Sequence, residues 1–308
     1  MITVKKNVNQ IKIEKNPLLK KMIDDLENTG FNAKRLAKAC KIYEKMVNNK
    51  ECKIFFSLAG AMVPAGMQNI IIDMVELGFV DVLVTTGANL THDIAEALGF
   101  HHFQGDLAID KKTDKDLHDE QINRIYDVFM PNNVYEGMED FIKTLKFDLN
   151  MSVKDFLHYL GNQLPDTPNS LLKACAEKNI PIFCPAFTDC GLAMQISFSF
   201  PKVNLNHFQD LQDMINIAWD AKTAGVCIIG GGVPKNYIFQ AMQFSPNSSQ
   251  YAIQITMDRP ETGGLSGAEL REAISWGKIN EKAEYSTVVS DATIALPIIL
   301  SYLKTVTN

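Results

Sequence analysis

The sequence predicts an α/β protein with a doubly wound, mostly parallel sheet and helices added before its first strand. Short apolar runs recur along the chain, and segments with apolar residues at helical spacing stand between them. Parallel strands need crossover connections, and helices in those connections cover both faces of the sheet. Since no internal repeat or Pro/Gly-rich linker divides the 308 residues, we expect a single domain over 1–308, with 1–50 as a helical extension.

The elements follow this rhythm in order. Residues 18–49 are predicted to form two amphipathic helices broken at Thr29 and Gly30, and the first strand covers 53–58. The later predicted elements are a helix over about 66–78, a strand at 80–85, helices over 134–163 and 168–178, a strand at 180–184, a helix over 207–223, strands at 226–229, 251–256 and 286–289, and a helix over 292–303. The polar stretch 105–133, rich in Asp and Lys, is predicted to be a solvated loop.

Composition and charge limit the classes of function. A hydrophobic content of 46% is enough for a large buried core. The formal charge of -6 does not suit nucleic acid or an anionic membrane, which favour clustered Lys and Arg, and it fits a cationic ligand better. No stretch approaches the roughly 18 continuous apolar residues of a membrane span, and the N-terminus has no apolar signal region. We therefore expect a cytoplasmic protein.

The cysteines carry no recognisable site. The six are Cys40, Cys52, Cys175, Cys184, Cys190 and Cys227. They form no C-x-x-C pair and have no histidine nearby in the sequence, so neither a zinc site nor a disulfide framework is predicted. We expect reduced, mostly buried thiols and no bound metal.

Small residues follow several of the predicted strands, at positions 57–62, 85–89, 185–189 and 230–235. In open parallel sheets, ligands bind beyond the carboxyl ends of the strands. Gly230, Gly231 and Gly232 can expose successive backbone N–H groups to a pyrophosphate, and Pro234 suits the first turn of the next helix. A tight turn without a ligand has the same pattern, and G-x-G-x-x-G is absent. The agreement of three strand ends nevertheless favours a nucleotide at this edge.

Two aspartates also follow apolar strands. Asp189 and Asp291 could accept hydrogen bonds from ribose hydroxyls or pair with an ammonium group. The alternative for each is a helix N-cap, for which Asp is a preferred residue. A helical pattern begins directly after Asp291, so capping is the stronger alternative there.

The densest group of reactive residue types lies over 263–278, where a glycine-rich loop enters a predicted helix that leads to Lys278. A lysine just past a helix ordinarily complements the helix dipole and stays in water. Here Trp276 can cover its cation, Gly277 permits a sharp turn, and the carboxylate of Glu272 stands nearby in the sequence. A lysine held in such a pocket loses its proton more readily and becomes a nucleophile toward imines or carbonyls.

The run from Ser275 to Lys278, with Glu272 and Ala273 before it, resembles the active-site signature of the deoxyhypusine synthase family, which includes homospermidine synthase-type relatives. Further matching blocks occur in family order at 80–93, 101–106, 122–125, 185–189, 230–235 and 263–267. The resemblance thus extends over nearly the whole chain. It implies a Rossmann-like fold and a homotetramer built as a pair of dimers, with NAD and spermidine bound at the dimer interfaces.

The resemblance also implies the reaction, an NAD-dependent transfer of the aminobutyl group of spermidine through an enzyme-lysine imine to an acceptor amine. It gives the catalytic role to Lys278. The positions implied to contact the substrate are Glu272, Trp276, Asn236, Gly263, Ser266, Gly267 and His92. The positions implied to bind NAD are Gly60, Ala61, Met62, Thr86, Gly87, Ala88, Asp189, Gly231, Asp258, Asp291 and Ala292.

The chain departs from the family pattern around the polyamine. Asn236 stands where eukaryotic members carry a catalytic histidine, and it cannot accept a proton near neutral pH. Met194 and Leu265 replace two aspartates that hold spermidine, and His92 replaces a glutamate near the nicotinamide. Three interpretations follow. The acceptor is a lysine of translation initiation factor 5A, or it is free putrescine, or the chain is a non-catalytic relative that binds NAD or a polyamine.

Overall fold

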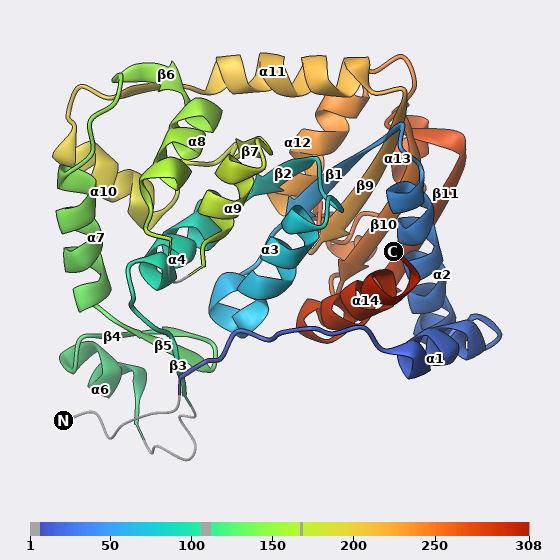
Figure 1. The fold of residues 1–308 in the computed structure, drawn as a ribbon, viewed down its shortest axis with the longest axis horizontal. Coiled ribbons are helices and arrows are strands. Elements are labelled where there is room, and N and C mark those ends of the chain that lie inside the picture. The colour runs from blue at the N-terminus through green and yellow to red at the C-terminus, as the bar shows by residue number, and fades with distance from the viewer. Residues whose placement is uncertain (1–6, 106–111, 167–168, 308) are drawn as a thin grey trace.

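The computed structural model describes residues 7–105, 112–166 and 169–307 (Figure 1). Its centre is a six-stranded sheet in the order β11-β10-β9-β1-β2-β7, in which every pair is parallel. The strands are β1 (Cys52–Leu58), β2 (Val82–Thr85), β7 (Ile182–Phe183), β9 (Thr223–Ile229), β10 (Ser249–Thr256) and β11 (Ile279–Val289). After β1, the strands β2 and β7 are added on one side of it, and β9, β10 and β11 are then added on the other side. This order confirms the predicted Rossmann-like fold and puts its switch point between β1 and β9.

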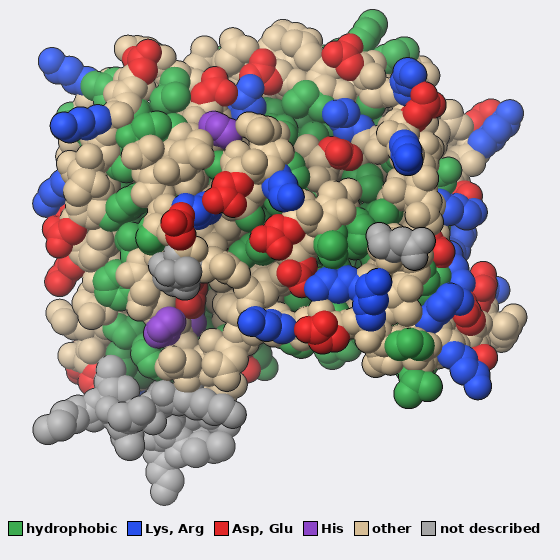
Figure 2. Space-filling view, in the orientation of Figure 1, with side chains coloured by type: hydrophobic (Ala, Val, Ile, Leu, Met, Phe, Trp, Pro, Cys, Tyr) green, Lys and Arg blue, Asp and Glu red, His purple; other side chains and the backbone are tan. Residues whose placement is uncertain are grey.

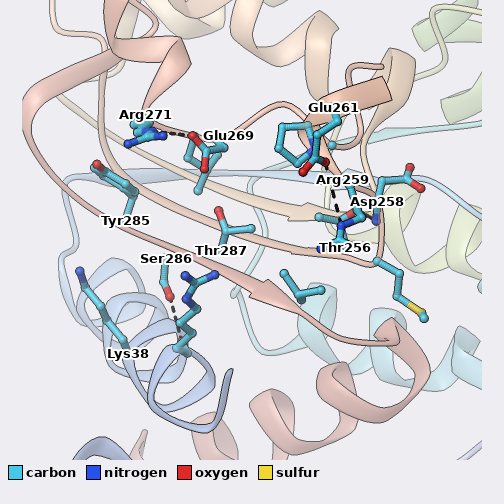
Figure 3. Close-up of a pocket in the computed structure, with 16 residues that line it drawn as sticks. Lys38, Thr256, Asp258, Arg259, Glu261, Glu269, Arg271, Tyr285, Ser286 and Thr287 are labelled. Atoms are coloured by element: carbon cyan, nitrogen blue, oxygen red, sulfur yellow. Dashed lines mark hydrogen bonds and ion pairs between the residues drawn. The ribbon is translucent and has the colours of Figure 1, made fainter. Parts of the chain in front are cut away.

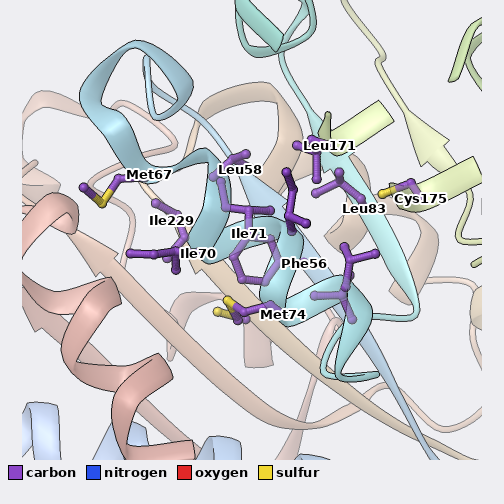
Figure 4. Packing of buried hydrophobic residues seen from close by; sticks show 14 of the residues in the cluster. Phe56, Leu58, Met67, Ile70, Ile71, Met74, Leu83, Leu171, Cys175 and Ile229 are labelled. Carbon is purple, nitrogen blue, oxygen red and sulfur yellow. The ribbon is translucent and has the colours of Figure 1, made fainter. Parts of the chain in front are cut away.

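Helices cover both faces of the sheet because neighbouring strand residues point to opposite sides. Phe56 and Ile229 pack with Ile71 and the helices α2 (Phe31–Asn48), α3 (Gln68–Glu76) and α14 (Ala292–Val306), and Figure 4 shows Phe56 and Ile71 in this cluster. Phe55 and Ile228 pack on the other face with α11 (His207–Asp220), α12 (Gly232–Met242) and α13 (Glu272–Ser275). The sheet therefore separates two cores, which is why its central strands are almost wholly apolar.

The added N-terminal helices are confirmed. Asn16 caps α1 (Pro17–Glu27) through its side-chain oxygen, which accepts hydrogen bonds from the amides of Leu18 and Leu19. Helix α2 then packs against β10 and β11. The remaining elements beside the sheet are η1 (Val63–Met67), α4 (Gly87–Ala97), α7 (Asn133–Lys143), β6 (Asn150–Ser152), α8 (Val153–Gln163), α9 (Leu171–Glu177), α10 (Gly191–Ser199), β8 (Asn204–Asn206) and η2 (Pro260–Thr262). No helix among the described residues is both long and apolar enough to cross a bilayer.

The prediction of a solvated loop at 105–133 is wrong for the residues the structure describes. This stretch and its approach hold β3 (Phe103–Gln104), α6 (Asp114–Asp119), β4 (Ile122–Ile125) and β5 (Val128–Pro131), and the three strands form an antiparallel sheet. Leu117, Ile122 and Phe129 make a small core of their own. Among the described residues, Asp114, Lys115 and Asp116 are exposed and lie outside this core, and Arg124 pairs with Asp114. Residues 106–111 lie outside the described part.

Two predicted elements differ most from the structure in their bounds. The helical pattern over 134–163 divides into α7, the short strand β6 and α8. The last strand begins at Ile279 and not at 286. Its first half was missed because β11 is an edge strand, and this half carries the charged residues Glu281, Lys282 and Glu284. Charged side chains are common on edge strands, where they face water. The predicted helix start at 168 lies outside the described residues.

Surface charge is mixed on the face seen in Figure 1. Figure 2 shows acidic and basic side chains interspersed there, with apolar side chains between them. Such a surface favours solubility of the folded chain over attraction to a single class of polyion.

Candidate active site

The switch point of the sheet is formed by two turns that leave β1 and β9 side by side. Leu58 and Ile229 are in register, and the amide of Ala59 donates to the carbonyl of Ile229 at 3.0 Å. Gly60 and Gly230 then adopt φ of 81° and 73°, a left-handed conformation that other residues rarely adopt. Both chains therefore turn sharply at the edge where a ligand of this fold class binds.

A buried asparagine fixes the first of these turns to the next strand end. Asn89, in the first turn of α4, accepts hydrogen bonds from the amides of Met62 at 3.1 Å and Val63 at 3.3 Å. Its amide nitrogen donates to the hydroxyls of Thr85 and Thr86, each at 3.3 Å. The hydrogen bonds of Asn89 thus connect the loops at 60–63 and 85–89. The sequence interpretation gave Asn89 no role, although an asparagine directly after a small-residue turn was a visible signal.

The glycine-rich turn after β9 packs against the loop that follows β10. A Cβ added to Gly231 would lie 2.3 Å from the Cα of Ser266, so only glycine fits. The side-chain amide of Gln254 reinforces this contact by donating to the carbonyls of Gly230 at 3.0 Å and Ser266 at 2.8 Å. The hydroxyl of Ser266 in turn donates to the carboxylate of Asp258. Gly231, Ser266 and Asp258, predicted from distant parts of the chain, therefore lie together.

A buried lysine holds the same loop. The ammonium of Lys235 donates to the carbonyls of Leu265 at 3.0 Å and Ala268 at 2.6 Å, and to the side-chain oxygen of Gln254 at 3.1 Å. Burial lowers the pKa of Lys235 to about 8, and the charge of Glu272 opposes this shift. Lys235 thus connects α12 to the loop over 264–268 through its hydrogen bonds.

Two cavities flank this edge of the sheet. One, of about 660 Å³, is lined by Asp258 and Gly267 and extends along β11 to Lys38 and Tyr285 (Figure 3). The ammonium of Lys38 lies 5.9 Å from the centre of the Tyr285 ring. Arg271, also in its wall, pairs with Glu269. A cavity of this size accommodates part of a dinucleotide.

The second cavity, of about 820 Å³, is lined by Ala61, Met62 and Asp291 and also by Tyr126 and Asp127 of the β4–β5 hairpin. The predicted cofactor residues after β1 and β11 therefore share one wall. The role of Asp291 as an N-cap also holds, since its carboxylate accepts from the amide and hydroxyl of Thr293, each at 2.7 Å.

The remaining predicted residues at this edge are more scattered. Gly87 packs so closely on Cys190 that an added Cβ would lie 2.5 Å from its side chain. Asp189 is exposed and does not cap α10, because Cys190 occupies that position. Asn236 is half-buried in α12, next to Lys235. The other residues of the predicted sets are Ala88 on α4, Ala292 at the start of α14, and Gly263, exposed after η2.

Lys278 stands in a separate group with Trp276 and Glu272. Its amide donates to the carbonyl of Ala273 at 3.0 Å, which closes the turn after α13, and Gly277 there has φ of 67°. Its ammonium lies 5.0 Å from the centre of the Trp276 ring. Partial burial lowers the pKa of Lys278, and the charge of Glu272 opposes the shift. The structure thus brings the predicted nucleophile, its indole and a carboxylate together.

Lys278 and the cofactor residues nevertheless lie at opposite edges of the sheet within one chain. The residue after Lys278, Ile279, pairs with Ser249 at the start of β10, whereas Thr256 pairs with Val289 at the carboxyl ends. Seven residues at roughly 3.3 Å each separate these edges by about 23 Å. In Figure 1, α13 lies toward the upper end of the sheet and the β4–β5 hairpin toward the lower end.

The sheet order and the strand-end glycines define the class as Rossmann-like α/β proteins. The family model described as deoxyhypusine synthase matches residues 21–303. The chain is 44% identical over 304 residues to probable deoxyhypusine synthase 1 of Methanosarcina mazei, which covers 97% of this chain and 94% of that protein. It is 40% identical over 298 residues to probable deoxyhypusine synthase 1 of Archaeoglobus fulgidus, covering 96% and 97%. This chain therefore belongs to the deoxyhypusine synthase family.

A solved structure agrees in fold. A crystal structure assigned to deoxyhypusine synthase in Entamoeba histolytica matches with a TM-score of 0.63 and 20% identity, and the match covers 96% of this chain and 98% of that one. At this identity the likeness shows the fold alone. Family membership, which the sequence relatives show, makes the chain a transferase.

Proposed function

We propose that this chain transfers the 4-aminobutyl group of spermidine to an acceptor amine, with Lys278 as the covalent carrier and NAD as cofactor. The observation that carries the proposal is the half-buried ammonium of Lys278 over the Trp276 indole, in a chain of this family. Burial disfavours the charged form, so the lowered pKa of Lys278 increases the unprotonated fraction that acts as a nucleophile.

Lys278 then has a defined sequence of bonds to make. Its amine attacks the imine carbon of oxidised spermidine, diaminopropane leaves, and the aminobutyl group stays on the lysine as a new imine. An acceptor amine displaces Lys278 in the same way, and reduction of the resulting imine completes the product. Glu272 and Trp276 are proposed to contact the ammonium groups of the polyamine through charge and through the ring face.

The carboxyl edge of the sheet fits NAD. Gly60 and Gly230 turn the chain so that backbone amides are presented at the switch point, and Gly231 has no side chain to obstruct the approach of a ligand. The carboxylates of Asp258 and Asp291 are proposed partners of the ribose hydroxyls. When bound, NAD supplies the hydride acceptor and later returns the hydride.

We further propose that each site is completed by a second copy of the chain within a homotetramer. The strand length of about 23 Å between Ile279 and the carboxyl edge supports this, because it separates the backbone of Lys278 from the cofactor turns of its own chain. Large apolar side chains at that edge are exposed, among them Met257 at 68%, Leu265 at 45% and Ile294 at 62%. Exposed apolar groups of this kind are typical of surfaces that another chain covers.

The proposed acceptor is a lysine of translation initiation factor 5A, and the names of the relatives at about 40% identity support it. A second candidate is free putrescine, which gives homospermidine. Met194 and Leu265, which stand in place of carboxylates, favour a changed polyamine pocket, and both side chains are about half exposed, at 55% and 45%. An apolar wall holds a polycation less tightly than a carboxylate does.

The test of the reaction uses the full chain with NAD and spermidine alone. We expect diaminopropane to be released and borohydride to trap an aminobutyl adduct on Lys278, read by peptide mass spectrometry. Lys278→Arg should abolish the adduct, while Lys282→Arg, which removes an exposed lysine on β11 four residues further along the chain, should leave it unchanged. No turnover and no adduct would support a non-catalytic relative, and net accumulation of NADH would indicate a simple dehydrogenase.

A second assay separates the two acceptors. Putrescine is added to one reaction and the initiation factor to another, with the same NAD and spermidine. Modification of the protein lysine supports deoxyhypusine synthesis, whereas homospermidine formation with an unmodified factor supports the diamine as acceptor.

A further inference from the structure

Three titratable side chains form a continuous hydrogen-bonded chain beside the carboxyl edge. The Nδ1 of His92 lies 2.8 Å from the Nε2 of His102, and the Nδ1 of His102 lies 2.6 Å from a carboxylate oxygen of Glu96. His102 is 1% exposed and His92 is 8% exposed. The ring nitrogens face each other in sequence, which is the arrangement of a proton path and not of ligands around a metal.

The carboxylate fixes the tautomers of both rings. Burial raises the pKa of Glu96, but hydrogen bonds from His102 and His101 outweigh it and hold the pKa below its usual range, so Glu96 is ionised at neutral pH. An ionised carboxylate only accepts, so the Nδ1 of His102 carries hydrogen, and in the neutral ring the Nε2 of His102 is then a free acceptor. The facing Nδ1 of His92 must then donate. The Nε2 of His92 is left with an unprotonated lone pair.

The Nε2 of His92 is the free end of this hydrogen-bonded series. Burial lowers the pKa of His92 to about 4, so the ring is neutral at pH 7. The titratable groups that act on His92 are His102 and Glu96. The Nδ1 of His101 lies 3.2 Å from the other oxygen of Glu96, but His101 is not part of this hydrogen-bonded series. The carboxylate of Asp93 accepts instead from Gln68 and from residues at the start of α9.

The hydrogen-bonded series ends at His92, one turn of α4 away from the residue that contacts the proposed cofactor loop. His92 and Asn89 are three residues apart on α4 and so share a face of the helix. Asn89 holds the amides of Met62 and Val63 at the switch point. Among the residues proposed to contact substrate, His92 and Glu272 have side chains that can accept a proton, and Glu272 lies in α13, just before Lys278.

We propose that His92, His102 and Glu96 form a proton relay for the polyamine substrate, an inference that rests on the proposed function. A secondary ammonium must lose one proton before the neighbouring carbon can give up a hydride, because the nitrogen lone pair forms the new C=N bond. The Nε2 of His92 takes that proton, its Nδ1 proton moves to the Nε2 of His102, and the imidazolium of His102 is held by the Glu96 carboxylate.

The step is balanced without a further reagent. The relay carries one proton and no electrons, and the hydride goes to the cofactor of the proposed reaction. When the hydride returns to the final imine, the same proton passes back through His102 and His92 to the product amine. In this scheme His92 is the catalytic residue, and His102 and Glu96 are positioning residues that act through it.

The first test needs no substrate. Nitrogen-15 NMR of imidazole-labelled protein at pH 7 should show both His92 and His102 as the neutral Nδ1–H tautomers. Glu96→Gln, which keeps an acceptor but removes the charge, should weaken this preference, whereas His158→Gln, at an exposed position of α8, should not change it. An Nε2–H tautomer or an imidazolium at His92 in the unaltered chain would overturn the relay.

The second test measures diaminopropane release from spermidine and NAD between pH 6 and 9. General acid–base catalysis contributes about 10²–10⁴ in rate, so Glu96→Gln and His102→Gln should each lower kcat by about 100-fold and alter its pH profile, with KM for spermidine changed little. His158→Gln, which removes an exposed histidine, is the control and should keep the original profile. Folding of each variant is checked by its unfolding temperature.

The outcomes of the two tests distinguish the proposals. If Glu96→Gln and His102→Gln keep the wild-type rate and pH profile, the relay is wrong while the proposed reaction stands. If the unaltered chain releases no diaminopropane, the proposed function fails, and NMR then decides by itself whether the three residues share a proton.

Discussion

Gly231 and Ser266 approach so closely that a Cβ on Gly231 would lie 2.3 Å from the Cα and 2.7 Å from the Cβ of Ser266. Backbone atoms on both sides make this contact, so a side chain on Gly231 cannot be accommodated by a rotamer change. The contact joins the glycine-rich turn after β9 to the loop at 263–268. The geometry of the proposed cofactor site therefore depends on one hydrogen atom in place of a methyl group.

Gly231→Ala is expected to displace the 263–268 loop and weaken NAD binding by tenfold or more, about 1.4 kcal/mol. The measurement is the dissociation constant of NAD by calorimetry. Gly264→Ala serves as the control, because a Cβ there would meet only the Thr262 hydroxyl at an ordinary 3.4 Å, and it should bind NAD within twofold of the original. Equal affinity in both variants would show that the loop does not shape the site.

Lys235→Met should change how stability depends on pH. The folded pKa of Lys235, about 8, lies below its ordinary value of 10.5 because of burial, so between these values the unfolded chain binds more protons. Stability of the unaltered protein should therefore rise as pH increases from 8 to 10.5, by about 3 kcal/mol at most. In Lys235→Met this rise should be absent.

Urea unfolding at pH 7.5 and pH 10 measures the effect as a difference between the two proteins, which removes the contribution of other titrating groups. Lys222→Met is the control, since Lys222 is exposed and pairs with Glu51 at the surface. Parallel pH dependences of Lys235→Met and the unaltered chain would mean that the buried ammonium keeps its ordinary pKa.

The central strands were predictable because burial on both faces leaves them almost wholly apolar. Phe55 and Phe56 point to opposite cores, and the glycines at 230–232 mark where β9 ends. The edge strand β11 was only partly predictable, since exposed charges such as Lys282 interrupt its pattern. The small sheet of β3, β4 and β5 was missed because its core is only a few side chains, including Phe129.

The edge of the sheet at which Lys278 lies was not predictable from the sequence. Gly263 and Lys278 are close in the sequence, and no local pattern indicates how far apart they lie in the fold. A connection between parallel strands must, however, return the chain to the amino edge before the next strand begins. The crossover from β10 to β11 does so, and it separates Ser266 from Lys278. The contact between His92 and His102 depends on the turn after α4, which no local pattern reveals.

Asp210 gives a second pH prediction, on the outer helices. Its carboxylate accepts from the amide of Lys154 at 3.1 Å and 3.2 Å, and burial raises its pKa from 3.8 to about 6. The folded chain therefore holds this proton more tightly than the unfolded chain. Stability from this group is fully present below pH 3.8 and is lost as pH rises through 6, by about 2–3 kcal/mol.

Asp210→Asn should remove that loss, so its stability relative to the unaltered protein should increase between pH 4 and pH 7. Chemical unfolding at several pH values in this window checks it. Asp213→Asn, one turn further along α11, pairs with Lys154 at the surface and should not show the effect. A constant difference between Asp210→Asn and the unaltered chain across the window would contradict the raised pKa.

Mixed assemblies test whether two chains share each proposed site. Lys278→Ala should be inactive alone for lack of the nucleophile, and Gly231→Ala should be nearly inactive when NAD is kept well below the raised dissociation constant of this variant. In a two-fold pair that mixes them, one site carries both defects and the other carries none. Random pairing of equal amounts makes about half of the pairs mixed, so roughly a quarter of the original activity should return.

The experiment requires coexpression with two different tags, so that the fraction of mixed assemblies is known before activity is measured. The control pairs Lys278→Ala with a chain that carries both substitutions, in which no site is intact and no activity should return. If each chain held a complete site, the mixture would stay as inactive as its parents. Restored activity would therefore show that the 23 Å between Lys278 and the carboxyl edge, about seven strand residues, is bridged by the neighbouring chain.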